Sequence, residues 1–365
     1  MTGSCLPSVT AAFERRARRT RAVASACVAA GFLWWFLKGV SLAAVAAEIR
    51  RAHVPYLAAA VALSLSGFAF RIWRWRYIVS PLKWVRFRSL ASAVFMGWAV
   101  SALLPGRLGE VARAALLSRR EDLRASAAFG TVVLERLLDV LAVLLLVAAS
   151  LAFVPHLAPG HSQLSLVVAI RTGAWITFAA LIGVAAVMLA AHHVGDSLRV
   201  ALGAWMTGLP GGSGRLGWGI IESFGSGVSG ALRGARHDQT PVRTRTWIAV
   251  HTALLWAVIC GVHALLFRAF DLQGSVLQLP LLIFLITLGL SVPVPAALGS
   301  YHAAVQLGLT VVFGVSNETA AGYAIVSHAV TLVPPAVIGV ILLAREGLAL
   351  SMLVPLTSST RSPGA

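Results

Sequence analysis

Long apolar runs are the feature that most restricts how this chain can fold. A helix needs about 20 mostly apolar residues to cross the roughly 30 Å hydrocarbon core of a bilayer. Several runs approach or exceed that length, and 58% of the 365 residues are hydrophobic while 12% are charged, about half the charged fraction of soluble domains. The sequence therefore predicts an all-α polytopic membrane protein. About six spanning helices are expected, at residues 22–38, 55–78, 126–151, 166–191, 247–268 and 320–344.

The positions of the Lys and Arg residues indicate how these spans are oriented. The net charge is +17, and 24 of the 30 Lys and Arg residues fall in five stretches. Residues 155–165 and 271–318 contain neither. Because cytoplasmic loops are enriched in Lys and Arg, we expect the basic stretches and both termini to be cytoplasmic. The charge then meets anionic lipid headgroups, and nucleic acid is not an expected partner.

Two further apolar regions, residues 89–118 and 276–314, are interrupted by Pro and Gly. The first has basic stretches on both sides and the second has uncharged or acidic flanks, so each is predicted to be a re-entrant helical hairpin. The interruptions share a pattern, since residues 105–109 read PGRLG and residues 295–299 read PAALG. Matched breaks with opposite orientation predict an inverted-topology repeat, a common architecture of transporters.

This repeat predicts how the chain is divided. The expected segments are a basic N-terminus (1–21), a first repeat (22–151), an external loop (152–165), a second repeat (166–344) with a cytoplasmic linker (192–246), and a tail (345–365). The linker contains GLPGGSGRLGWG, which lacks the Lys and Ser/Thr of a phosphate-binding loop. Three scattered cysteines are too few for a disulfide framework or a zinc site.

The first break is a candidate ligand site. A broken helix at membrane depth leaves backbone amides that protein or a water-filled cavity must satisfy. The helix that follows presents its N-terminus, which attracts anions, and guanidinium groups are suited to phosphate. The expected substrate-binding residues are Gly106, Arg107, Gly109 and Arg113, with Pro105 organising the cavity.

Glu110, within the same break, has more than one interpretation. It could cap the new helix by accepting from its first amides. It could instead pair with a nearby arginine, and an internal pair with Arg107 would hold the hairpin shut.

Glu135, Arg136 and Asp139 lie within the apolar run 126–151. Arg136 can reach Asp139 three residues later, and ionisable groups inside a membrane span should face the protein interior and pair there. A contact from Arg113 to either acid would indicate structural bracing, whereas an unpaired carboxylate could carry a coupling proton. We favour bracing, because the nearby cations suffice to neutralise both acids.

The second half offers two histidines near the second break. His302 and His328 could bind an anionic headgroup when protonated, with Pro295 and Gly299 organising the cavity. A metal site needs a third ligand that no spacing supplies, so neither a metal nor a cofactor is expected.

The sequence RIWRWRYI, residues 71–78, places three arginines among tryptophans. This pattern is typical of an anchor at the membrane interface. The alternative is that these arginines gather anionic lipid.

The segments LLPGRLGEVARAALL (103–117), ERLLDVLAVLLL (135–146) and the run from PVPAALGSYH to VIGVILL (293–343) resemble one known family. They are similar to the membrane domain of lysylphosphatidylglycerol synthase/flippase proteins and its stand-alone relatives. The resemblance implies movement of lipid between leaflets of a bacterial inner membrane. In that family a separate soluble domain aminoacylates the lipid, and a chain ending at Ala365 is not expected to carry it. The second box is usually Pro-Gly-Gly-x-Gly, and many relatives have Glu where this chain has His302, so the headgroup stays open.

The sequence thus predicts a flippase-like transporter for an anionic lipid or lipid-linked substrate, and not an enzyme. Two alternatives are an intramembrane lipid-headgroup transferase and a non-transporting scaffold of a lipid, hopanoid or glycolipid synthesis complex. A second copy of the chain and lipid-synthesis enzymes are the protein partners left open.

Overall fold

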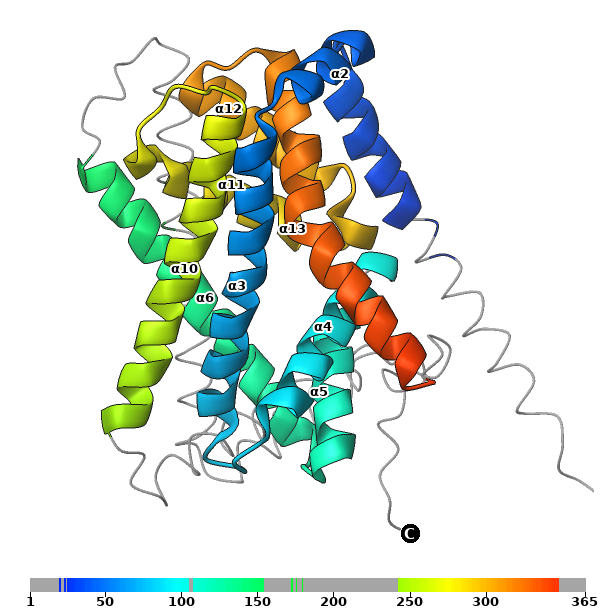
Figure 1. The fold of residues 1–365 in the computed structure, drawn as a ribbon, viewed down its shortest axis with the longest axis vertical. Helices are drawn as coiled ribbons and strands as arrows, with labels where there is room; N and C mark the ends of the chain where they lie inside the picture. Colours follow the sequence, from blue (N-terminus) through cyan, green and yellow to red (C-terminus); the bar gives the residue numbers. More distant parts are fainter. Residues whose placement is uncertain are drawn as a thin grey trace, which may run out of the picture.

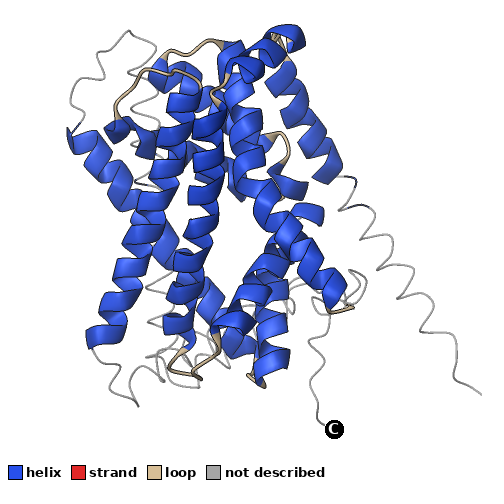
Figure 2. Cartoon of the chain, in the orientation of Figure 1, coloured by secondary structure: helices blue, strands red, loops and turns tan. Residues whose placement is uncertain are grey.

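A computed structural model describes residues 25–104, 108–153 and 242–347, together with a few isolated positions. Within these ranges every regular element is a helix, so the predicted all-α fold is confirmed (Figure 2). Several predicted segments lie outside them. These are the N-terminus 1–21, the loop 152–165, the span 166–191, nearly all of the linker 192–246, and the tail 345–365 beyond residue 347.

The described elements follow one another as shown in Figure 1. They are the helix Ser25–Leu37, α2 (Leu42–Arg51), α3 (Val54–Val79), α4 (Phe87–Leu103), α5 (Leu108–Glu121), α6 (Ala125–Phe153), α10 (Val242–Ala269), η1 (Val276–Gln278), α11 (Leu279–Ser291), η2 (Pro295–Ala297), α12 (Ser300–Phe313) and α13 (Asn317–Arg345).

Four described helices are long and apolar enough to cross a membrane. Three are α3, α10 and α13, which match the predicted spans 55–78, 247–268 and 320–344. The fourth is Pro295–Phe313, which joins η2 to α12. The predicted span 126–151 is the 29-residue helix α6. The protein is therefore a multi-pass membrane protein, and among the described residues four helices, or five if the bent pair counts as one span, are candidates for the predicted set of about six.

The first predicted span, 22–38, is helical over its described part and ends at a sharp bend. Its described part, Ser25–Leu37, is followed by a 79° bend into α2. Gly39 at the bend has a φ of 76°, a conformation that glycine adopts without steric cost. Ser41 then begins α2 by accepting from the amide of Ala44 at 3.4 Å. Together these residues form the bend that joins the two helices.

Helices α4 and α5 form a tightly packed pair. A Cβ atom added to Gly109 would lie 1.9 Å from the carbonyl oxygen of Gly97, so only glycine permits this approach. The outer ends of the pair are also neighbours, because Lys83 Nζ donates to the carbonyl oxygen of Glu121 at 2.9 Å. The chain thus enters α4 and leaves α5 at the same end of the molecule.

Helices α11 and α12 form a second such pair at the opposite end of the molecule (Figure 1). A Cβ atom on Gly289 would lie 2.6 Å from the carbonyl oxygen of Ser300. One on Gly274, just before η1, would lie 2.8 Å from the ring of Phe313, the last residue of α12. The chain therefore enters and leaves this pair at one end too.

The second break is a strained turn. Ala296 and Ala297 have φ values of 50° and 52°, and Gly299 has a φ of 81°. Alanine seldom adopts this left-handed region, which costs about 1–2 kcal/mol per residue, so the surroundings must hold the turn. Helix Ser25–Leu37 does so, because Gly299 packs so closely on it that a Cβ atom would lie 2.8 Å from the carbonyl oxygen of Ala29.

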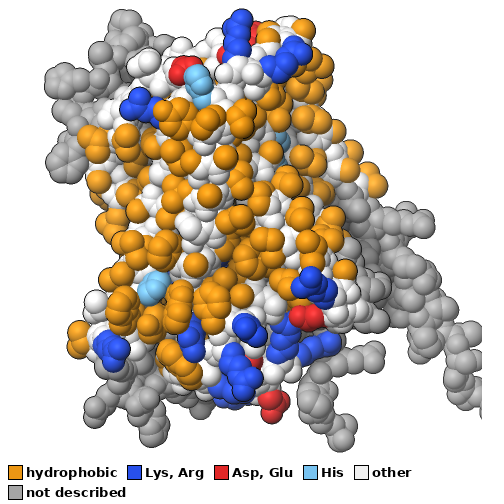
Figure 3. Space-filling model, in the orientation of Figure 1, with side chains coloured by type: hydrophobic (Ala, Val, Ile, Leu, Met, Phe, Trp, Pro, Cys, Tyr) orange, Lys and Arg blue, Asp and Glu red, His pale blue; other side chains and the backbone are white. Residues whose placement is uncertain are grey.

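The surface matches a protein that lies in lipid. Figure 3 shows hydrophobic side chains over the middle of the molecule. Lys and Arg gather mainly at the end where α4, α5 and the last turn of α13 lie. A hydrocarbon core accommodates such an apolar band, and the headgroups accommodate the charge.

Gly109→Ala tests the packing of α4 against α5. We expect it to lower the free energy of unfolding by about 1–3 kcal/mol, because the added methyl group forces the helices apart. Chemical unfolding in detergent micelles measures this change. Gly31→Ala is the matched control, since its methyl group would meet nothing within 4 Å. Equal stability of the two variants would contradict the packing.

Candidate functional site

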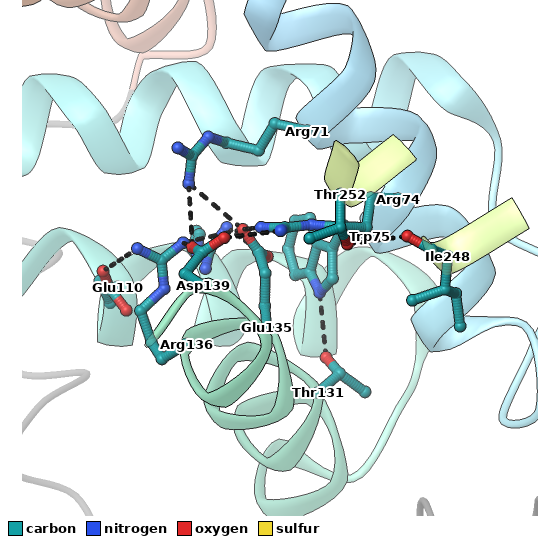
Figure 4. Close-up of polar contacts among 11 residues, drawn as sticks. Arg71, Arg74, Trp75, Glu110, Thr131, Glu135, Arg136, Asp139, Ile248 and Thr252 are labelled. Carbon is teal, nitrogen blue, oxygen red and sulfur yellow. Dashed lines mark hydrogen bonds and ion pairs between the residues drawn. The ribbon is translucent and has the colours of Figure 1, made fainter. Parts of the chain in front are cut away.

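Seven charged side chains from three helices are joined by ion pairs, and Figure 4 labels all of them except Arg113. We call them the charge cluster. Its members are Arg71 and Arg74 of α3, Glu110 and Arg113 of α5, and Glu135, Arg136 and Asp139 of α6.

Glu135 is at the centre of the charge cluster and is fully buried. Its Oε1 atom lies 3.0 Å from Arg74 Nη2, 2.8 Å from Arg136 Nη2 and 3.3 Å from Arg71 Nη1. Its Oε2 atom lies 3.0 Å from Arg113 Nη1. A buried carboxylate is stable only when paired, and this one receives cations from α3, α5 and its own helix.

Asp139 lies one turn further along α6 and shares these cations. Arg74 Nη1 donates to Asp139 Oδ1 at 2.6 Å, and Arg136 Nη2 lies 3.0 Å from Oδ2. The contact from Arg136 is the one expected from the spacing of three residues. With Arg113 on Glu135, both acids have arginine partners, which is the arrangement that structural bracing requires.

The interpretation of RIWRWRYI as an interfacial anchor is wrong for two of its arginines. Arg71 and Arg74 point into the charge cluster, and Arg74 is fully buried. Arg76 lies apart from them, with its guanidinium 4.2 Å from the ring of Trp84. The spacing of three residues between Arg71 and Arg74 puts them on one helix face. That signal could have identified them as a pair directed at one neighbouring helix, but it does not say which helix.

Glu110 pairs with a residue that the sequence did not suggest. Its Oε1 atom lies 3.5 Å from Arg136 Nη1 on the neighbouring helix α6. The expected partner Arg107 lies outside the described residues, as do Pro105 and Gly106. Glu110 is in the first turn of α5, where a carboxylate also interacts favourably with the helix dipole.

The charge cluster contains four arginines and three acids, so its formal charge is +1. Some of its donors have no hydrogen-bond partner within the part of the chain that the structure describes. Arg113 is 5% exposed, and its Nε and Nη2 atoms are buried and unpaired. A buried donor without a partner costs about 1–3 kcal/mol. The charge cluster therefore has both the charge and the free donors to bind an anion.

A cavity of about 430 Å³ adjoins the charge cluster, and we call it the central cavity. At one end it is lined by five members of the cluster. At the other end it is lined by polar and aromatic side chains of α10, α11, α12 and α13, including Trp256, His263, Thr287, Tyr301, His328 and Thr331. Both breaks reach it, the first through Gly109 and the second through Ala296 and Ala297.

The two candidate histidines are neighbours, with ring centroids 4.8 Å apart. His328 stacks on Tyr301 at 4.5 Å, and both line the central cavity. His302 does not line it. It packs 5.1 Å from the ring of Phe36, and its Nδ1 atom is buried without a partner. Pro295 and Gly299 form the turn that leads into α12.

Metal binding has no support among the described residues, where no three His, Cys, Asp or Glu side chains could jointly hold an ion.

Comparison with known proteins supports the family that the motifs suggested. A sequence model described as the lysylphosphatidylglycerol synthase TM region matches residues 22–339. The matched range includes every residue of the charge cluster and every residue that lines the central cavity. A search of curated proteins found no match to the chain.

Glu135→Gln tests the bracing role of the buried carboxylate. We expect it to lower the free energy of unfolding by about 3–5 kcal/mol, because it leaves buried arginines without their counter-ion. The measurement is chemical unfolding in detergent. Asp271→Asn is the control, since its partner His53 is 51% exposed and Asp271 is 77% exposed. An exposed pair contributes at most about 1 kcal/mol, so equal losses would count against the bracing role.

Proposed function

The chain belongs to the lysylphosphatidylglycerol synthase membrane-region family, and on that premise we propose that it moves a lipid between the two leaflets of a membrane. The substrate is an anionic lipid or lipid-linked molecule whose headgroup enters the central cavity. The observation that carries this proposal is the pair of unpaired donors on Arg113 beside a cluster of net positive charge.

A headgroup phosphate suits these donors. Nε and Nη2 lie on one planar guanidinium, which can donate to two phosphate oxygens at once. Nη1 of the same group stays on Glu135 at 3.0 Å, so the arginine is held in place while it binds. His328 and Tyr301, at the other end of the central cavity, offer hydrogen bonds to the uncharged part of a headgroup.

The ion pairs of the two acids in the site are those expected for transport without covalent chemistry. Glu135 and Asp139 each contact at least three arginines. Ion pairs with arginines already engage both carboxylates, so these residues fit counter-ions better than a catalytic base or a proton carrier.

The helix pairs support an alternating-access mechanism. In this proposal α4–α5 and α11–α12 are re-entrant hairpins that enter from opposite sides, and the two halves form an inverted repeat. The adjacent ends of each pair favour this arrangement, because Lys83 contacts Glu121 and Gly274 packs on Phe313. In this proposal the basic end is cytoplasmic, as the positive-inside rule favours, and both termini lie on the cytoplasmic side of a bacterial inner membrane.

Arg113→Gln tests the headgroup site. We expect at least a tenfold loss of fluorescent phosphatidylglycerol translocation in liposomes, because a charged hydrogen bond worth about 1.5–3 kcal/mol is removed. Arg113→Lys keeps the charge on Glu135 and should retain the fold while losing the two-pronged contact. Arg119→Gln, on the exposed face of the same helix, should translocate normally. Equal rates in all three variants would reject the site, as would full activity of a correctly inserted Arg107→Glu variant.

Cysteine labelling tests the topology. In a variant whose three native cysteines are replaced by serine, Arg86→Cys and Arg119→Cys should both react with an impermeant maleimide from the cytoplasmic side. Gln273→Cys should react from the opposite side. These positions are exposed next to the two helix pairs. Labelling of residues 86 and 119 from opposite sides would mean that α4 and α5 together cross the membrane.

A further inference from the structure

The Glu110–Arg136 pair separates two hollows of the protein. One is the central cavity, which both side chains line. The other is an open groove of about 400 Å³ between α5 and α6, which the same two side chains line at one end. We call it the lateral groove. Its remaining walls are apolar, formed by Val111, Phe129, Val132, Val133 and Leu137.

The two members of this pair are held unequally. Arg136 is fixed to its own helix by contacts of 2.8 Å to Glu135 and 3.0 Å to Asp139. Glu110 lies 3.5 Å from Arg136, and its side chain is 29% exposed. A partly exposed pair at this distance contributes little stability. The carboxylate of Glu110 can therefore leave Arg136 without disturbing the rest of the charge cluster.

An anion in the lateral groove is next to Arg136, which lines both hollows, whereas Arg113 lines the central cavity alone. In Figure 4 Glu110 and Arg136 lie at one edge of the charge cluster, away from Arg74. A phosphate that replaces the Glu110 carboxylate on Arg136 exchanges one anion for another, so no buried cation is left unpaired during the exchange. The apolar walls of the groove suit the hydrocarbon attached to that phosphate.

We propose that the lateral groove seats an acyl chain of an anionic membrane lipid and that the Glu110–Arg136 pair is the gate through which its headgroup reaches the central cavity. This inference rests on the proposed function and adds the route by which the lipid arrives. The occupant of the groove is a lipid acyl chain, and the headgroup of that lipid carries a negative charge, opposite to that of Arg136.

Filling the lateral groove with a larger side chain tests whether it binds an acyl chain. Val133→Trp, in the groove wall, should slow translocation of fluorescent phosphatidylglycerol in liposomes at least about tenfold. A tenfold change corresponds to the free energy lost when about two methylene groups of the acyl chain are no longer buried. Val337→Trp is the matched control, because Val337 is 50% exposed on α13 and lines neither hollow. Native mass spectrometry should show less phosphatidylglycerol retained by the groove variant only.

These outcomes separate the route from the function. If Val133→Trp translocates like Val337→Trp while Arg113→Gln is slow, the gate is rejected and the headgroup site stands. If Arg113→Gln is also unaffected, the proposed function itself is rejected.

Weakening the Glu110–Arg136 pair should raise the translocation rate. Glu110→Gln keeps the shape of the side chain and removes its charge, so translocation should become about two- to fivefold faster. A variant that is no faster would overturn the gate, and a loss of stability beside it would show that Glu110 braces the fold.

Discussion

The buried carboxylate of Glu135 is the group on which the rest of the site depends. A lone carboxylate inside a membrane protein is costly, so it must be matched by cations, and α3, α5 and α6 all supply them. These ion pairs hold α5 against α6 and α3. The match is not one for one, because four arginines surround three acids. The same interaction that holds the helices together therefore leaves positive charge and free donors at the central cavity.

The cavity exists because two helix pairs end inside the protein. The break before α5 and the strained turn before α12 both reach the central cavity, although nearly 190 residues separate them in the chain. Close glycine packing at Gly97, Gly109 and Gly289 keeps each pair narrow. Narrow helix pairs leave space between their inner ends. The backbone polar groups freed at the breaks can therefore face the central cavity.

The two ends of the central cavity differ in chemistry. The end beside α5 and α6 carries arginines and acids, whereas the end beside α12 and α13 carries Tyr301 and His328. The predicted repeat, if it governs transport as we propose, does not extend to the side chains that line the cavity. In the proposed cycle the lipid phosphate stays with the arginines, and the lateral groove next to Arg136 is its route of approach.

The sequence by itself determined the helical membrane fold, the spans at α3, α10 and α13, and the two breaks, because apolar length, Pro and Gly act locally. It also predicted that Arg136 would reach Asp139, since helix geometry alone puts them together. Local patterns could not assign Arg71 and Arg74, which meet acids more than 60 residues away. Nor could they find the partner of Glu110 or the bend after Leu37. Periodicity states which side chains share a helix face, but only tertiary packing decides which faces meet, and every cross-helix contact of this site follows from that choice.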